Sequence, residues 1–292
     1  MAEVQIAIAG ISSKLALNVA AECLKDPNIR LRGSCRSVAK LPAFLTQSPQ
    51  VTLIESGAYD QDSLRSLVTG CSVVICCYYA DNKTMVEGQK LLIDICEEQG
   101  VARFLASDYT ADYTKLDSGD IVLKDPMKYI HTYLSNRSSV KGVHVLVGLM
   151  METFWQYFDV WHPDENKLCF WGTGHETWDL TTYHTVAQYI AAVALDPSAV
   201  GIKKFVGQQI TIRDIASDIK AVLGVEPRLE SRGPLQDIQN KIDDVNGGQN
   251  PVAAGMYYTL TGKIGLGGQL DNDRYPHIKV QTFRDFLRSR VG

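Results

Sequence analysis

The sequence has no long run of apolar residues, and none approaches the roughly 18 that a helix needs to cross a bilayer. It also has no basic stripe and no block of like charge, and its formal net charge is -4 at pH 7. A protein that binds nucleic acid by neutralising phosphates needs an excess of cations instead. The N-terminus runs directly into a strand, without the charged and apolar regions of a secretion signal. We therefore expect a cytoplasmic protein with neither a membrane nor a nucleic acid as partner.

Cysteine is present, but without the spacing that metal sites and disulfide frameworks use. The seven cysteines are an odd number and include no Cys-x-x-Cys pair. Most lie in apolar segments, where a free thiol behaves as a small hydrophobic group. Cys76 and Cys77 are adjacent in a strand, so their side chains point to opposite faces and cannot hold one metal ion. The sequence therefore predicts no metal site and no disulfide. Gly-x-Ser-x-Gly and His-Glu-x-x-His motifs are absent as well.

The first half of the chain alternates strands with helices. Strand-like segments occur at 4–10, 29–35, 51–55, 72–79, 102–107 and 143–148. Helical patterns lie between them, as at 84–100, where apolar residues recur at helical spacing. Such alternation predicts an α/β fold with a doubly wound, Rossmann-like parallel sheet and right-handed crossovers. Ligands of such sheets bind at the carboxyl ends of the strands.

The pattern loosens after about residue 150, which predicts a doubly wound domain at 1–150 and a smaller, mainly helical cap at 151–292. We expect the cap to contribute some elements back to the sheet. Residues 167–184 have the pattern of a hairpin, and 211–224 that of a helix with a threonine N-cap and a glycine just beyond its end. The glycine-rich segment 262–268 precedes no helix and predicts a flexible loop that lines a pocket.

The turn after the first strand has part of a dinucleotide-binding fingerprint. That fingerprint places three glycines in the turn, and here Gly10 stands at the first position while Ser13 and Ala16 occupy the later two. Gly10 permits a tight turn into the helix, whose N-terminal amides attract a pyrophosphate. Ser13 can either crowd or hydrogen-bond a phosphate, and Ala16 still permits close packing of helix on strand. The turn alone fits a cofactor site and an ordinary strand–helix turn equally well.

The end of the second strand favours NADPH over NADH. Sites that prefer NAD place an acidic residue about 20 positions beyond the turn, on the ribose 2′-hydroxyl. This chain has no acidic residue between Asp26 and Glu55. Arg36 follows the strand instead, with Lys40 one helical turn further on. A guanidinium there suits a 2′-phosphate, although two solvated surface cations remain the alternative.

Several segments, in order, resemble the atypical short-chain dehydrogenases that include NmrA-like proteins and the isoflavone reductase and phenylcoumaran benzylic ether reductase enzymes. They are "GISSKLA", "CRSVAKL", "GAYDQDSLRSLVTGCSVVICC", "LLIDICEEQGVARFLASDYTADY" and "LDNDRYPHIKVQTFRDFL". The resemblance covers nearly the whole chain. It implies an NAD(P)-binding domain at 1–150 and a substrate-binding cap at 151–292. Departures from the family pattern are Ser13, Ala16 and Ala58, the last of which stands where the family usually has an aspartate beside the adenine.

The same resemblance points to a catalytic residue, because a lysine on the helix after the fifth strand is commonly catalytic in this family. The family pattern falls on Lys128. Lys128 shares one helix face with His131 and Thr132, and a lysine whose pKa is lowered can relay protons. A Tyr-x-x-x-Lys match at 79–83 lies at the end of the fourth strand instead, and we interpret it as coincidental.

Further candidate site residues lie at or after the carboxyl ends of the predicted strands, where ligands of such sheets bind. Tyr109 is a second catalytic candidate, as a proton donor or a stacking wall. Predicted cofactor contacts are Gly10, Ser12, Ser13, Arg36, Lys40, Tyr78, Ser107 and Lys128. Predicted substrate contacts are Tyr79, Met150, Phe154 and Trp155.

The leading hypothesis is an NADPH-dependent reductase of a small aromatic or conjugated metabolite, in which Lys128 assists proton transfer. We expect the protein to be a monomer or a homodimer. One alternative is an NmrA-like regulator that senses dinucleotide without turnover. Another is an isomerase, cyclase or lyase that reuses the same pocket without redox chemistry.

Overall fold

The structure, a computed structural model, describes residues 3–243 and 248–291. The chain divides into two compact units, each built from several stretches. The first unit comprises Met1–Tyr109, Pro126–Val145 and Ala187–Lys203, and the second comprises Thr110–Asp125, Leu146–Val186 and Lys204–Gly292. The units therefore interleave along the sequence, for which we predicted a boundary at residue 150 with some later elements returning to the sheet. The reason is that a late strand, Gly201–Lys204, joins the first sheet.

The first unit contains a seven-stranded sheet with the order β11-β6-β5-β4-β1-β2-β3. Its strands are β1 (Val4–Ala9), β2 (Ile29–Cys35), β3 (Val51–Glu55), β4 (Val73–Cys76), β5 (Arg103–Leu105), β6 (Lys141–Leu146) and β11 (Gly201–Lys204). All pairs from β3 through β6 are parallel. The strand order reverses between β1 and β4, which is where doubly wound sheets bind their ligands. The predicted fold class is confirmed.

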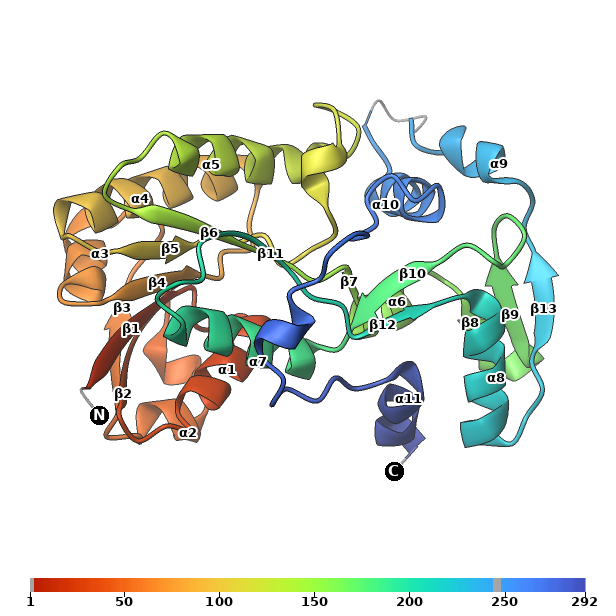
Figure 1. The fold of residues 1–292 in the computed structure, drawn as a ribbon, viewed down its shortest axis with the longest axis horizontal. Helices are drawn as coiled ribbons and strands as arrows, with labels where there is room; N and C mark the ends of the chain where they lie inside the picture. Colours follow the sequence, from red (N-terminus) through yellow and green to blue (C-terminus); the bar gives the residue numbers. More distant parts are fainter. Residues whose placement is uncertain (1–2, 244–247, 292) are drawn as a thin grey trace. The chain divides into compact units, whose positions relative to one another are not determined.

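Helices cover both faces of this sheet (Figure 1). They are α1 (Lys14–Cys23), α2 (Ala43–Thr46), α3 (Gln61–Val68), α4 (Gln89–Glu98), α5 (Asp125–Ser135) and α7 (Tyr183–Leu195). A π-helical turn, Thr84–Gly88, precedes α4, so the helix predicted over 84–100 begins with a wider turn. Such turns are frequent at functional sites. Figure 1 shows α3, α4 and α5 on one face, with α1 and α7 on the other.

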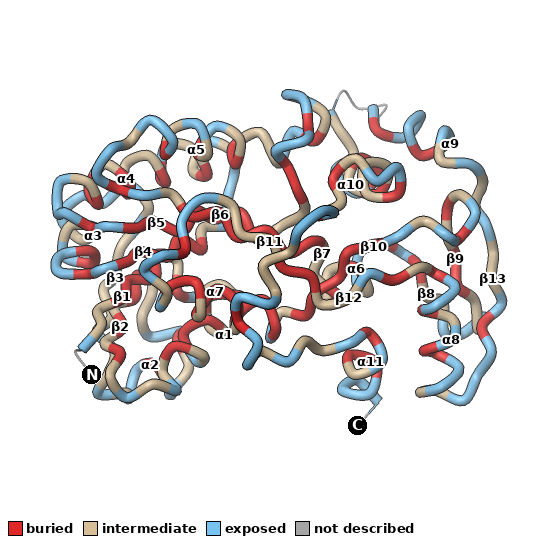
Figure 2. The backbone as a smooth tube through the Cα atoms, viewed as in Figure 1, coloured by how far each residue is buried: buried red, intermediate tan, exposed pale blue. Residues whose placement is uncertain are grey.

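One apolar cluster joins the first of these faces to the sheet. Ala9, Val74 and Phe104 come from three neighbouring strands and have no exposed surface. Leu92 on α4 and Ile130 on α5 pack against them and are equally buried. Figure 2 shows the resulting concentration of buried chain in the central strands β1 and β4. This core holds the carboxyl ends of the strands at fixed positions.

The second unit is built mainly of helices, with two small sheets between them. Its helices are α6 (Met151–Tyr157), α8 (Ile212–Leu223), α9 (Leu235–Gln239), α10 (Pro251–Leu260) and α11 (Phe283–Val291). One sheet has the order β12-β10-β7 and the other β13-β9-β8. The strands are β7 (Leu149–Met150), β8 (Trp161–His162), β9 (Lys167–Phe170), β10 (Trp178–Thr181), β12 (Gln208–Ile210) and β13 (Arg228–Ser231).

The hairpin predicted over 167–184 is wrong, because β9 and β10 belong to different sheets. The Glu176 carboxylate accepts hydrogen bonds from the Thr173 and Gly174 amides at 2.9 and 2.8 Å, which closes the intervening turn without strand pairing. The predicted helix α8 is confirmed. Thr211 is its N-cap, within a capping box completed by Asp214.

All seven cysteines are free and buried. Burial raises the pKa of the Cys23 and Cys77 thiols to about 12. Because only a thiolate attacks a disulfide reagent, we expect none of the seven thiols to react with dithionitrobenzoate in the folded protein near pH 8. All seven should react once denaturant unfolds the chain. Rapid reaction of even one thiol in the folded protein would contradict this packing.

Two further absences apply to residues 3–243 and 248–291. None of their helices is long and apolar enough to cross a membrane. No three His, Cys, Asp or Glu side chains among them are arranged to hold a metal ion.

Candidate dinucleotide site

The turn between β1 and α1 depends on a glycine. Gly10 has φ +80°, in the left-handed region, and a Cβ there would lie 2.9 Å from the Cys77 carbonyl oxygen. The amides of Gly10 and Ile11 both donate to the Ser34 carbonyl on β2, at 3.0 and 2.9 Å. The turn is thereby held against the ends of β2 and β4. No side chain fits at position 10, which agrees with the glycine that the fingerprint places there.

The start of α1 combines a cap with open donors. Ser13 is the N-cap, and its Oγ accepts from the Ala16 amide at 3.2 Å. The hydroxyl of Ser13 thus serves the helix. The amides of exposed Ser12 and of Leu15 have no acceptor in the described part of the chain. Unpaired N–H groups at a helix N-terminus, reinforced by the helix dipole, form a site for a phosphate.

Two cations stand at the end of β2. Arg36 and Lys40 are exposed. Within residues 3–243 and 248–291, neither side chain has an ion pair or a hydrogen bond. Their donors are therefore free to bind a phosphate. Sequence reasoning missed the nearby Glu55, whose Oε1 accepts from the Val38 amide at 2.9 Å and so holds the turn between the two cations. The parallel pairing of β3 with β2, which puts Glu55 opposite Cys35, is the signal that could have revealed it.

The two tyrosines after β4 have different environments. Tyr78 packs its ring beside the turn, since a Cβ on Gly10 would lie 3.2 Å from its Cδ1 and a Cβ on Gly88 would lie 3.5 Å from its Cε2. Its buried hydroxyl has no hydrogen-bond partner among the described residues, and burial raises the pKa of Tyr78 well above its usual range. Tyr79 is 97% exposed and lines neither of the pockets described below. Of the two, Tyr78 forms part of the wall beside the turn.

Ser107, just after β5, links three elements. Its hydroxyl donates to the Tyr78 carbonyl at 2.7 Å, and its amide donates to Oε1 of Gln89 at 2.9 Å. The Gln89 amide group in turn donates to the Met85 carbonyl, in the π-helical turn, at 2.7 Å. Ser107 and fully buried Gln89 therefore fix the ends of β4 and β5 relative to that turn.

Tyr109 has an unusual backbone, with φ 41°. Its buried hydroxyl donates to the Cys76 carbonyl at 3.0 Å. Burial, followed by the neighbouring Cys77, raises the pKa of Tyr109 well above its usual range. This hydrogen bond ties Tyr109 to the end of β4. The catalytic role of Tyr109 stays a prediction.

A buried cluster of ionisable groups lies beside α5, and sequence reasoning missed it. The Asp108 Oδ2 is 2.5 Å from Nδ1 of His144 on β6, and both residues are under 5% exposed. The His144 ring centroid lies 4.6 Å from that of His131 on α5. Burial, and then the His144 charge, lower the pKa of His131 below its usual range. The three residues are far apart in sequence, and only the adjacency of β5 and β6 could have indicated the contact.

Lys128 lies on the same helix as His131, one turn earlier, and is half-buried. Its backbone carbonyl accepts a hydrogen bond from Oγ1 of Thr132 at 3.1 Å. The face shared by these three residues is thus part of a regular helix. The catalytic role of Lys128 remains a proposal.

The other three predicted substrate contacts, Met150, Phe154 and Trp155, lie within the second unit. Phe154 has no exposed surface, and its ring centroid lies 4.9 Å from that of Trp178 and 6.2 Å from that of Phe283. The Trp155 ring lies 5.6 Å from that of Phe283. Met150, in β7, is half-buried. None of these three predicted contacts lines either pocket, and Phe154 is a core residue because its ring is enclosed by other rings.

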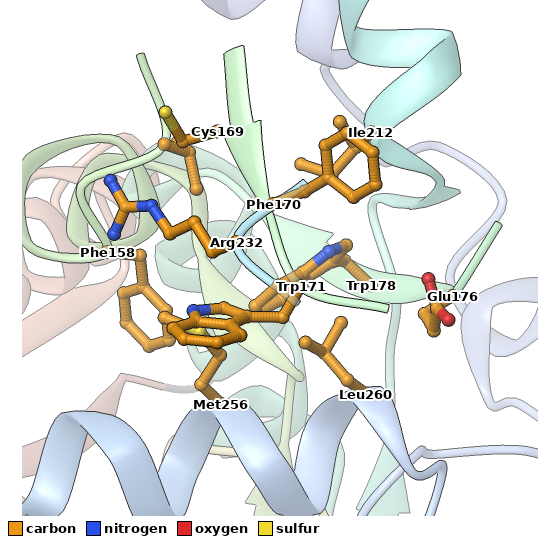
Figure 3. Close-up of a pocket in the computed structure, with 11 residues that line it drawn as sticks. Phe158, Cys169, Phe170, Trp171, Glu176, Trp178, Ile212, Arg232, Met256 and Leu260 are labelled. Atoms are coloured by element: carbon orange, nitrogen blue, oxygen red, sulfur yellow. The ribbon is translucent and has the colours of Figure 1, made fainter. Parts of the chain in front are cut away.

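One pocket of the second unit has aromatic walls (Figure 3). Trp171 and Trp178 line it, and Figure 3 shows the Arg232 guanidinium and the Glu176 carboxylate at its opposite ends. Arg232 is already bound to Oδ2 of Asp159 at 2.6 Å. The pocket has a volume of only about 10 Å³, no more than one water molecule needs. It is too small for an aromatic substrate.

Comparisons with known proteins agree with this geometry. Residues 10–134 match the family model described as NAD(P)H-binding. Isoflavone reductase superimposes with a TM-score of 0.80 at 17% identity, over 99% of each chain. "AtPrR2 with NADP+ and (+)pinoresinol" gives 0.81 at 16% identity, also over 99% of each chain.

Leucoanthocyanidin reductase from Vitis vinifera, in its binary complex with NADPH, gives a TM-score of 0.82 at 13% identity, over 98% of this chain and 99% of that one. No curated protein matches the chain by sequence. Residues 10–134 are therefore similar to the NAD(P)H-binding family, and the whole chain has the fold of isoflavone reductase, as its sequence resemblance predicted.

Proposed function

We propose that the protein is an NADPH-dependent reductase of a small aromatic or conjugated metabolite. The observation that carries the proposal is the combination of open amides at the start of α1 with two unpaired cations at the end of β2. The amides suit a pyrophosphate, and the cations suit the 2′-phosphate that distinguishes NADPH from NADH. The residues present therefore fit this cofactor.

Each part of the site has a separate task. The amides of Ser12 and Leu15 would hold the pyrophosphate, against a turn that Gly10 keeps free of side chains. Arg36 would bind the 2′-phosphate through two parallel hydrogen bonds, with Lys40 adding charge. Ser107 and Tyr78 fix the ends of β4 and β5. When bound, the cofactor would supply a hydride. Lys128 would deliver or remove the accompanying proton.

The likeness to known reductases supports the proposed class of substrate. One similar structure contains NADP+ and pinoresinol, and two others are an isoflavone reductase and a leucoanthocyanidin reductase. We extend from them to this chain only the class, a small aromatic or conjugated molecule. The identities of 13–17% leave the substrate itself to be found by experiment.

The experiment that tests the function compares NADPH and NADH binding in Arg36→Ala. Loss of a charge-assisted pair to the 2′-phosphate should weaken NADPH binding by about 10- to 100-fold, since such bonds contribute roughly 1.5–3 kcal/mol. NADH, which lacks that phosphate, should bind almost as before. Titration followed by nicotinamide fluorescence measures both affinities.

Arg30→Ala is the matched control. Arg30 lies near the start of β2 and Arg36 just beyond its end, about 20 Å away at the usual rise of roughly 3.3 Å per residue. The Arg30 side chain is 41% exposed beside Glu3. The Arg30→Ala variant removes the same charge at the other end of β2, so it should leave the affinities for NADPH and NADH unchanged. Absence of NADPH binding by the unaltered protein, or equal effects of the two variants, would overturn the proposed site.

A further inference from the structure

The second unit contains a larger cavity, distinct from the aromatic pocket. Its volume is about 200 Å³. Leu149 and Ile264 contribute apolar surface, while Lys115, Asp179 and Gln209 contribute polar atoms. An engineered apolar cavity of about 150 Å³ admits benzene, so this space can hold an aromatic ring with small substituents.

The glycine-rich loop 262–268 forms one wall, as the sequence predicted, and hydrogen bonds hold its middle in place. The Ile264 carbonyl accepts from the Asp112 amide at 3.0 Å. The Lys115 ammonium donates to the Gly265 carbonyl at 2.5 Å, and the Leu266 amide donates to Oδ2 of Asp179 at 2.7 Å. Three consecutive residues are thus tied to other segments. The cavity is therefore preformed, as is usual for small-molecule sites.

The same loop presents backbone, and no bulky side chain, at its glycines. A Cβ on Gly267 would meet no atom within 4 Å. A Cβ on Gly265 would make only ordinary contacts, at 3.5 Å to the Gly262 carbonyl oxygen and 3.7 Å to Oδ2 of Asp179. Packing therefore does not require glycine at these two positions. Their bare peptide planes leave space against which a flat ring can lie.

Lys115 brings a positive charge to the cavity. Other groups of the protein neutralise this charge only weakly. Its nearest carboxylate, Asp112, lies 3.7 Å away and is already bound by Lys204 at 2.7 Å and by Oγ1 of Thr114 at 2.5 Å. Burial alone would raise the pKa of Asp112, but the hydrogen bonds from Lys204 and Thr114 outweigh it and hold that pKa below its usual range. The Asp112 charge is thus shared, and Lys115 has ammonium donors left for an anion.

Asp179 supplies the opposite chemistry. It is only 9% exposed, and its oxygens accept from the Gln209 amide group and the Leu266 amide, both at 2.7 Å. Both donors are neutral, and no Lys, Arg or His nitrogen of the described residues lies within 4.0 Å of this carboxylate. A carboxylate oxygen can accept a second hydrogen bond. Asp179 is therefore suited to a ligand group that donates one, such as a hydroxyl.

We propose that this cavity binds a flat, hydroxylated aromatic carboxylate. The carboxylate pairs with Lys115, the hydroxyl donates to Asp179, and the ring lies between the glycine wall and the apolar side chains of Leu149 and Ile264. Binding depends on the second unit alone and needs no nucleotide. That such a molecule is also the hydride acceptor rests on the proposed function.

The test uses 4-hydroxybenzoate as the probe, with the full chain and without nucleotide. Benzoate lacks the hydroxyl, and 4-hydroxybenzamide lacks the charge. Ligand-observed NMR titrations of the three compounds give their relative affinities. We expect 4-hydroxybenzoate to bind about tenfold or more tightly than 4-hydroxybenzamide, and several-fold more tightly than benzoate, because charge-assisted hydrogen bonds are stronger than neutral ones.

Two variants locate the site. Lys115→Met should remove the preference for the carboxylate, and Gly267→Leu should abolish binding by filling the cavity, although its Cβ has room. Lys220→Met is the control, because Lys220 is 61% exposed in the same unit and pairs with Glu226 outside the cavity. Unfolding midpoints confirm that the variants fold.

No binding of 4-hydroxybenzoate, or binding that neither Lys115→Met nor Gly267→Leu weakens, would overturn the inference. Its failure is distinguishable from failure of the proposed function. If 4-hydroxybenzoate does not bind but NADPH does, only the cavity proposal is overturned. Intact probe binding in a protein that binds no NADPH supports the cavity and overturns only the reductase.

Discussion

Replacing Gly10 with valine is expected to abolish NADPH binding and to lower the free energy of unfolding by about 2–4 kcal/mol. The left-handed backbone alone costs a residue with a Cβ roughly 1–2 kcal/mol, and a β-branched side chain tolerates it worst. The added Cβ also lies 2.9 Å from the Cys77 carbonyl oxygen. This oxygen belongs to the backbone, so it cannot move aside as the end of a flexible side chain could. The turn must therefore shift, taking with it the amides of Ser12 and Leu15.

Urea unfolding and nicotinamide fluorescence measure the two effects separately. Gly255→Val is the matched control, since Gly255 lies in α10 of the second unit and a Cβ there meets nothing within 4 Å. It should change stability by no more than about 0.5 kcal/mol, as surface substitutions usually do, and leave NADPH affinity unaltered. A Gly10→Val protein that unfolds at the original midpoint and binds NADPH would show that the turn does not have this conformation.

Arg103→Met should destabilise the protein by about 3–5 kcal/mol, because it removes several hydrogen bonds from a buried charged donor, each of which contributes roughly 1.5–3 kcal/mol without full additivity. Arg103 is 6% exposed, and its guanidinium donates to the carbonyls of Val193, Ala194 and Asp196 at 2.9, 2.5 and 2.8 Å. Val193 and Ala194 belong to the last turn of α7, and Asp196 follows it. The Val193 and Asp196 carbonyls also accept from the Asp196 and Ala199 amides, at 3.3 and 3.0 Å. Methionine fills similar space but donates no hydrogen bond, so each carbonyl loses its charged donor.

Arg32→Met provides a demanding comparison for that result. Arg32 also donates to two carbonyls at a helix end, those of Ser66 and Thr69 at 2.9 and 2.6 Å, but at the surface. Water can replace its hydrogen bonds, so this change should cost about 1 kcal/mol or less. Equal unfolding free energies for the two variants would refute the importance of burial at Arg103.

The sequence was most informative where structure is local. The strands β2 and β3 have the bounds that their composition predicted, and the caps of α8 were placed by a threonine and a glycine. Gly10 was also recognisable, because the turn after a first strand demands one residue type. Local patterns of this kind depend on backbone geometry and on nearest neighbours, which the order of residues specifies directly.

The contacts that were missed join residues distant in the sequence. Asp108 and His144 meet because β5 and β6 are neighbours, and Glu55 reaches the end of β2 by a similar route. Apolar patterning also cannot tell a pocket wall from a core. Phe154 follows a strand end, where substrates often bind, yet other rings surround it completely.

The interleaving of the two units has a consequence for the protein as it is synthesised. Strand β11 completes the sheet beside β6, but it comes from residues 201–204. At the usual rate of roughly 5–20 residues per second, β6 waits for several seconds with an unpaired edge. An open strand edge is a template for pairing with another chain. The nascent chain is therefore most prone to aggregate before residue 204 leaves the ribosome, and folding at low temperature or with a chaperone should improve its yield.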